Sequence, residues 1–239
     1  MSYLEYNAKS TPTGLRKILY LNWPLTLLLA SVAGVGFLML YSVAGGSFSP
    51  WAEPQFKRFL LGMGVMIVVG LIPIWFWRNI SVLAYLISVM LLLAVEFFGT
   101  VGMGAQRWID LGFMRLQPSE LMKITSVMLL AAYYDWLPPE RSSRPIWVLV
   151  PVLMILLPTL LVLRQPDLGT SILLLAAGGG VMFLAGVHWA YFAVVFAAGI
   201  GLITAVFQSR GTDWQLLKNY QYRRIDTFLD PSQDPLGAG

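Results

Sequence analysis

The chain has 239 residues, of which 57% are hydrophobic and 12% are charged, and its mean hydropathy is +0.70. About a quarter of the residues of an average soluble domain are charged, so this composition excludes such a domain and predicts an all-α, polytopic membrane helix bundle. The lack of cysteine excludes disulfides, the single histidine excludes a histidine metal cluster, and a net charge of +4 spread between apolar spans favours anionic lipid over nucleic acid as a partner.

Long apolar runs divide the chain into a terminal segment and a membrane core. Residues 1–17 are polar, and the core of membrane helices is expected to cover 18–208. A helix needs about 20 apolar residues to cross a bilayer. The seven expected membrane helices are 23–44, 59–77, 81–96, 118–134, 145–163 and two within 168–208.

Proline and glycine interrupt the later spans. Pro151 and Pro158 predict a kinked fifth helix, because proline removes a backbone hydrogen bond. The uncharged run 168–208 is too long for one helix, so residues 186–189 are expected to form the turn between the sixth and the seventh. The triple glycine 178–180 either permits close helix packing or weakens the sixth helix.

Residues 104–123 carry five charges between two long apolar spans. The charged residues are Arg107, Asp110, Arg115, Glu120 and Lys123. Gln117-Pro118 predicts a helix start, because proline is tolerated at the first helical position. Glu120 then lies in the first turn, where the helix dipole favours an anion, and Lys123 shares its face.

This pattern allows two interpretations. A helix N-terminus flanked by Arg115 and Lys123 at the membrane surface suits a phosphorylated headgroup. Alternatively, the segment is an interfacial loop whose basic side chains reach lipid phosphates, and Lys123 only neutralises Glu120. The residues alone leave both interpretations open.

A second segment repeats the same arrangement. Residues 164–170 contain an arginine, then Gln-Pro, then Asp167 at the start of a helix. Asp167 could pair with a nearby cation and fix the site, or it could be a buried acid that caps the helix.

The last part of the chain, 209–239, is polar, aromatic and charged. It is expected to begin a large loop. Because the sequence stops at Gly239 within a glycine-rich turn, we expect the chain to be the N-terminal part of a longer protein.

Four stretches in this order resemble one family. They are GAQRWIDLG at 104–112, QPSELMK at 117–123, QPDLGTS at 165–171 and NYQYRRIDTFLDPSQDPLGAG at 219–239. Together they are similar to the SEDS family (shape, elongation, division and sporulation), and to its elongation branch more than its division branch. The resemblance implies ten membrane helices, of which seven lie in this chain, and a large outer loop after the seventh.

The resemblance also implies a function. Members polymerise lipid II, a disaccharide-pentapeptide on undecaprenyl pyrophosphate, into glycan strands during cell elongation and rod-shape maintenance. This inverting glycosyltransferase reaction takes place on the outer face of the bacterial cytoplasmic membrane. The implied partners are a class B penicillin-binding protein and the elongation machinery.

The charges alone do not fix the orientation. Three basic residues before the first helix favour a cytoplasmic N-terminus, yet that orientation leaves most of the 16 basic residues outside, against the positive-inside rule. The family resemblance implies that the N-terminus is cytoplasmic and that 99–117, 164–167 and 209–239 lie outside.

The candidate substrate-binding residues are Arg107, Arg115, Glu120, Lys123 and Asp167. Of these, Arg115, Lys123 and Asp167 match residues that the resemblance marks as functional. The cations would hold the pyrophosphate and stabilise charge on the leaving group. Whether a divalent cation assists stays open.

No catalytic base is assigned in this chain. The resemblance places the base in a later His-Thr-Asp-Phe motif, and none of Asp226, Asp230 or Asp234 occupies that position. We therefore expect the 239-residue chain by itself to be inactive. Two further hypotheses are a lipid II flippase or transporter, which charges within the membrane would suit, and a non-catalytic membrane scaffold.

Overall fold

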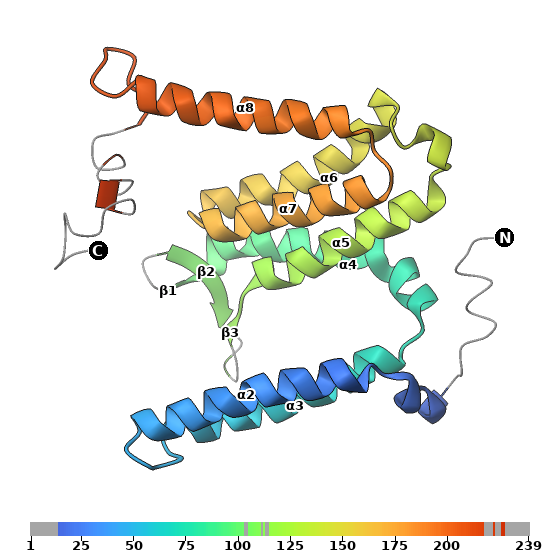
Figure 1. Cartoon of the computed structure of the whole chain (residues 1–239), viewed down its shortest axis with the longest axis vertical. Coiled ribbons are helices and arrows are strands. Elements are labelled where there is room, and N and C mark those ends of the chain that lie inside the picture. The colour runs from blue at the N-terminus through green and yellow to red at the C-terminus, as the bar shows by residue number, and fades with distance from the viewer. Residues whose placement is uncertain are drawn as a thin grey trace. The chain divides into compact units, whose positions relative to one another are not determined.

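The computed structural model describes residues 14–102, 105–110, 112, 115–217, 222 and 226–227. These residues form seven α-helices, two short 3-10 helices and three short strands (Figure 1). The elements are η1 Gly14–Tyr20, α2 Trp23–Val43, α3 Ala52–Leu71, α4 Ile74–Phe98, β1 Thr100–Gly102, β2 Ala105–Asp110, β3 Arg115–Leu116, α5 Pro118–Trp136, η2 Pro139–Arg141, α6 Pro145–Arg164, α7 Leu168–Leu184 and α8 Trp189–Gln208.

Five helices, α2, α3, α4, α6 and α8, are long and apolar enough to cross a membrane. Helix α7 is apolar but shorter. Helix α5 has 19 residues and carries Glu120 in its first turn. The predicted all-α membrane fold is therefore confirmed, and the chain is a multi-pass membrane protein.

Most helix bounds agree with the sequence prediction to within two residues, but the second and third helices were predicted wrongly. Helix α3 already begins at Ala52, seven residues before the predicted start at residue 59. Lys57 pairs with Glu53 one turn earlier, at 2.6 Å, so its charge is accommodated at the exposed start of the helix. Pro73 lies between Leu71, where α3 ends, and Ile74, where α4 begins, and Ile72 before it is extended, as a following proline favours.

The chain forms two compact units, Met1–Leu83 and Ala84–Gly239, with the boundary inside α4. In the first unit α2 and α3 pack together, and Phe37 of α2 meets Phe56 and Phe59 of α3 edge to face, with ring centroids 5.5 and 5.6 Å apart. Lys17 donates hydrogen bonds to the carbonyls of Leu71 (3.2 Å) and Ile72 (3.0 Å). A cation thereby satisfies carbonyls at the end of α3, where the helix dipole favours positive charge. Of the predicted segment 1–17, residues 1–13 lie outside the described residues.

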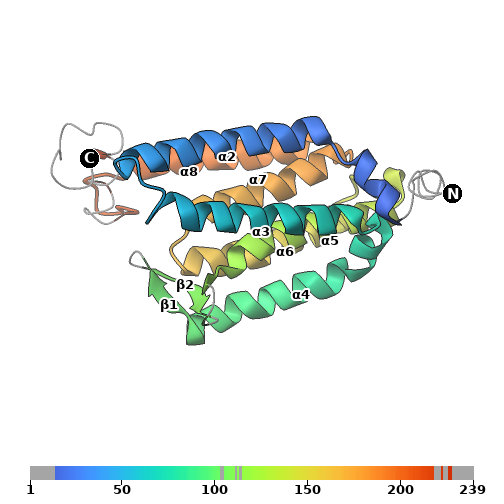
Figure 2. The same cartoon turned by 90° about the horizontal axis from the view of Figure 1, so that it is seen from below.

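In the second unit α5, α6 and α7 lie side by side, with the second half of α4 against them (Figure 2). Apolar side chains of all four helices form one buried cluster, namely Tyr85, Leu92, Met122, Leu129, Val162 and Leu174. The Tyr85 hydroxyl donates to the Met154 carbonyl at 2.8 Å and so joins α4 to α6. Helix α6 continues through Pro151 and Pro158, both buried, and its predicted kink stays a prediction.

The connections of the second unit lie alternately at its two ends. Strands β1, β2 and β3 form an antiparallel sheet between α4 and α5, which the sequence did not predict. Contacts of β2 place this sheet beside the α6–α7 turn. At the other end, the Ser143 hydroxyl donates to the Gly186 carbonyl (3.2 Å) and accepts from the His188 amide (2.9 Å). Tyr191 also donates to the Ser143 carbonyl at 3.0 Å, so the α5–α6 and α7–α8 turns are joined.

The triple glycine of α7 serves close packing at one position only. A Cβ atom on Gly178 would lie 2.5 Å from Ile155 Cγ1 of α6, whereas one on Gly179 or Gly180 would meet nothing within 4 Å. Gly178 therefore lets α6 and α7 approach, and the other two glycines are not needed for this contact.

We predict that Gly178→Ala destabilises the protein, because Ile155 is buried and would have to move. Overpacking of this kind costs roughly 1–3 kcal/mol. Gly179→Ala and Gly180→Ala are matched controls and should leave stability unchanged or raise it by up to about 1 kcal/mol, since alanine favours the helix. Thermal unfolding of the three variants in one detergent measures this, and equal melting temperatures would contradict it.

Candidate functional site

Arg107 joins the sheet to the α6–α7 turn. Its Nε donates to the Gln165 carbonyl at 3.0 Å, and its Nη2 donates to the Pro166 carbonyl. Its Nη1 lies 3.8 Å from Asp167 Oδ2, and the two side chains are 28% and 13% exposed. Two segments almost 60 residues apart in sequence are thus in direct contact, and the predicted pairing of Asp167 with a cation is present.

Asp167 also caps α7. Its Oδ1 accepts from the Thr170 amide at 3.1 Å, and its Oδ2 accepts from the Thr170 hydroxyl at 2.9 Å. A side chain in this position satisfies a backbone donor that has no partner within the helix. Both interpretations of Asp167 are therefore present together, because one carboxylate caps the helix and faces Arg107.

Arg115 lies on the short strand β3, opposite Asp110 on β2. Its Nε is 3.8 Å from Asp110 Oδ2, and the two side chains are 70% and 46% exposed. An exposed ion pair of this length contributes little to stability. The Arg115 guanidinium is therefore available to a ligand that approaches the end of the bundle.

Lys123 lies one turn into α5 and pairs with Glu120. Its Nζ is 2.9 Å from Glu120 Oε1 and 2.8 Å from Oε2, as the i, i+3 spacing predicts. The Lys123 side chain is only 28% exposed and that of Glu120 is 56% exposed. The ammonium is thus held close to the helix surface by a more exposed carboxylate.

The start of α5 has the predicted form. Gln117 is extended, Pro118 is the first helical residue, and no side chain among the described residues caps the helix. Ser119 is 2% exposed, and its hydroxyl has no hydrogen-bond partner among the described residues. The backbone amides and positive dipole of this N-terminus therefore lie near Arg115 and Lys123 in the chain, as an anion site requires.

Sequence reasoning missed two residues of this region. Asp110 was seen as a charge but not as the partner of Arg115, which depends on the strand register. Gln165 was seen only as part of a motif, yet it is buried, and its side-chain amide donates to the Leu92 carbonyl of α4 at 3.2 Å. Among the described residues no three acidic or histidine side chains are close enough together to hold a metal ion.

The described residues after α8 fold back onto its end. Tyr222 is 2% exposed, and its hydroxyl donates to the Val206 carbonyl at 2.6 Å and lies 3.0 Å from Ser209 Oγ. Arg210 lies over the Tyr222 ring, 5.3 Å from its centroid, and donates both guanidinium branches to Asp226 at 2.9 and 2.7 Å. Asp226 therefore has a structural partner, while Asp230 and Asp234 lie outside the described residues.

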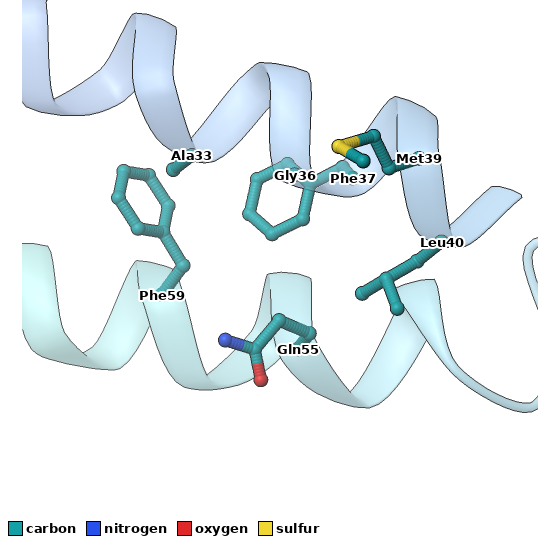
Figure 3. A pocket seen from close by; sticks show the side chains of 7 residues that line it. All are labelled: Ala33, Gly36, Phe37, Met39, Leu40, Gln55 and Phe59. Carbon is teal, nitrogen blue, oxygen red and sulfur yellow. The ribbon is translucent and has the colours of Figure 1, made fainter. Parts of the chain in front are cut away.

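A hollow of about 530 Å³ lies between α2 and α3 in the first unit (Figure 3). Ala33, Gly36, Phe37, Met39 and Leu40 line it from α2, and Gln55 and Phe59 line it from α3. Its lining carries no charge, so it suits an apolar chain and not a pyrophosphate.

Apolar helices with charged residues gathered at the helix ends define a multi-pass membrane protein whose candidate site lies at one end of its bundle. The family model described as cell cycle protein, for FtsW, RodA and SpoVE, matches residues 23–239. The chain therefore belongs to this family, which confirms the resemblance to the SEDS proteins.

Relatives and solved structures agree with the family. The chain is 34% identical over 222 residues to the peptidoglycan glycosyltransferase MrdB of Escherichia coli K12, covering 92% of this chain and 57% of MrdB. It also matches a chain in a solved structure that concerns the structural coordination of polymerization and crosslinking by a peptidoglycan synthase complex. The TM-score is 0.72 at 30% identity, and the match covers 90% of this chain and 61% of that one. The rod shape determining protein RodA of Thermus thermophilus matches with a TM-score of 0.61 and 28% identity, over 80% of this chain and 64% of RodA.

The Arg210–Asp226 pair predicts a pH dependence. Hydrogen bonding from Arg210 holds the pKa of Asp226 below the usual range of an aspartate. The pair therefore stabilises the fold-back above the unfolded pKa of about 4 and loses this effect as pH falls through the lower folded pKa. Hydrogen exchange of residues 209–217, corrected for intrinsic rates, should accelerate at about pH 3 relative to pH 6. Asp226→Asn is the control and should show no such change; equal pH dependence in both proteins would contradict the prediction.

Proposed function

We propose that this chain is the N-terminal part of a peptidoglycan glycosyltransferase that polymerises lipid II during cell elongation. The names of its relatives support this activity, since MrdB is a peptidoglycan glycosyltransferase. The chain spans 57% of the length of MrdB and 50% of that of an Escherichia coli FtsW. The activity is therefore proposed for a protein as long as these relatives.

The observation that carries the proposal is the uncapped N-terminus of α5 between two cations. Arg115 precedes the helix start by three residues, and Lys123 follows it by five. A pyrophosphate there can accept from backbone amides and from both side chains. Because Arg115 is 70% exposed and its ion pair is long, a headgroup can displace Asp110 at little cost.

The chemistry assigned to these residues is electrostatic. A sugar hydroxyl attacks the anomeric carbon of lipid II, the bond to the pyrophosphate breaks, and negative charge develops on the leaving group. Arg115 and Lys123 stabilise that charge, and Glu120 orients Lys123 through the contacts at 2.8 and 2.9 Å. The carboxylate that removes the hydroxyl proton is not assigned among the residues of this chain.

The membrane arrangement follows from this role. Residues 1–17 lie in the cytoplasm, 18–208 form the membrane core, and the segment from 209 onward begins an outer loop. The end of the second unit that carries the β-sheet and the α6–α7 turn then faces outward, where lipid II is polymerised. A class B penicillin-binding protein is the proposed partner, since the matching complex coordinates polymerization and crosslinking.

A lipid II flippase is the second candidate function. The observation that favours it is a set of buried hydroxyls between the helices. Thr125 of α5 donates to Ser88 of α4 at 3.1 Å, and the buried hydroxyls of Ser119 and Ser126 have no partner among the described residues. Polar groups inside a membrane bundle often line a path for polar cargo.

We predict that the full-length protein, reconstituted in vesicles, converts lipid II into glycan polymer. Polymer is measured by gel electrophoresis of labelled lipid II, and translocation by protection of the same label from an external enzyme. Polymer without accelerated translocation is the expected result, because the candidate site is at the membrane surface. Translocation without polymer would replace this proposal with the flippase.

We predict that Arg115→Ala and Lys123→Ala each lower polymerisation by roughly 10- to 100-fold in the full-length protein, since a charge-assisted hydrogen bond is worth about 1.5–3 kcal/mol. Arg115→Lys should also lower it, because lysine cannot make a bidentate contact. Arg141→Ala is the control, since Arg141 lies over Trp147 in the α5–α6 connection, at the other end of the unit.

The pair Glu120→Gln with Lys123→Met separates binding from charge balance. If Lys123 only neutralises Glu120, this charge-free pair should restore both polymer yield and thermal stability. Restored polymer yield would remove Lys123 from the substrate site, whereas restored stability without polymer is the result we expect.

A further inference from the structure

We propose that Arg107 is a positioning residue, which fixes the β-sheet to the α6–α7 turn and does not itself contact the lipid headgroup. We call its contacts with Gln165, Pro166 and Asp167 the Arg107 bridge. The effect of the bridge on polymerisation rests on the proposed function, but the bridge itself does not.

The donors of Arg107 are already engaged inside the protein. Its Nε and Nη2 each donate to a backbone carbonyl of the turn, and its Nη1 faces Asp167 at 3.8 Å. The Arg107 side chain is 28% exposed, against 70% for Arg115. A phosphate that bound Arg107 would leave the carbonyls of Gln165 and Pro166 without this partner, at a cost that binding of Arg115 does not carry.

The β-sheet and the α6–α7 turn, which the bridge joins, are each also fixed to α4. Gln165 donates from its side chain to the Leu92 carbonyl at 3.2 Å. On the side of the sheet, Gln106 donates to the Gly99 carbonyl at 2.8 Å, just after α4 ends. The Arg107 bridge therefore closes a link between two segments that each pack on the same helix.

Asp167 has two roles in the bridge: it balances the charge of Arg107, and it caps the start of α7. Both of its carboxylate oxygens accept from Thr170, and Arg107 provides a positive charge beside them. Asp167 thereby fixes the first turn of α7, while the two carbonyl contacts fix the preceding turn. Lysine could not reproduce this arrangement, because one ammonium lacks the planar fork that reaches three acceptors.

The test uses hydrogen exchange of the full 239-residue chain, which needs no activity. Arg107→Ala should raise the exchange of residues 164–168 and of β2 at least about tenfold, because hydrogen bonds from a charged donor are lost. Arg107→Lys should raise it nearly as much. Asp167→Asn should raise it less in the turn, since the two carbonyl contacts remain.

Arg164→Ala is the matched control. Arg164 is an exposed arginine at the last residue of α6, next to the same turn, and it is outside the bridge. Its replacement removes the same charge and should leave exchange of the turn and of β2 unchanged. If Arg107→Ala prevents folding, Arg107→Lys decides the test.

A kinetic measurement on the full-length protein separates positioning from headgroup contact. A positioning residue should lower kcat for polymerisation with little change in KM, whereas a direct contact in the ground state should raise KM. Unchanged exchange in Arg107→Ala and Arg107→Lys, or a rise in KM with normal exchange, would overturn the proposal. Absence of polymer with the unmodified protein would defeat the proposed function instead, and the exchange result would still decide the bridge.

Discussion

The constraint on which this structure depends is that backbone groups within or near a bilayer need partners inside the protein. Helices meet this demand by themselves, but the connections between them do not. At the charged end of the second unit, a side chain therefore replaces the missing partners, as Arg107 does for the carbonyls of Gln165 and Pro166. The same rule explains Lys17 at the end of α3 in the first unit. Polar residues in this chain first complete the fold, and those left exposed are available to a ligand.

Exposure divides the candidate site residues into two groups. Arg107 and Asp167 are largely covered and make several contacts each, whereas Arg115 is mostly exposed and, within the described part of the chain, makes one long ion pair. Lys123 is intermediate, since it is covered but paired with an exposed carboxylate. A charged residue that is already satisfied gains little from a ligand, so the residues with the fewest internal contacts are the better candidates for headgroup binding. This distinction could not be made from residue types alone.

The sequence predicted features that depend on near neighbours. The helix start at Pro118 and the capping position of Asp167 follow from a few adjacent residues, and the structure has both. The break at Pro73 is equally local, but the predicted second helix, 59–77, runs through it. Contacts such as Arg107 with Gln165 could not be predicted, since they join residues 58 positions apart through helix packing and strand register. The small sheet was missed for a different reason: its strands have only two to six residues, too few to show a clear pattern in the sequence.

Helix α8 is held at its start and uncovered along most of its length. Tyr191 donates to the α5–α6 connection near its start, and none of its own residues is buried. The contacts described for Tyr222 near its end are with Val206, Ser209 and Arg210, so they join α8 to the residues that follow it and not to the other helices. A helix attached at one end keeps orientational freedom at the other, and a neighbouring membrane helix that covered it would have to order it at a cost in entropy. The exposed length of α8 is in this sense a hinged contact surface, whose angle is set by the neighbour that packs on it.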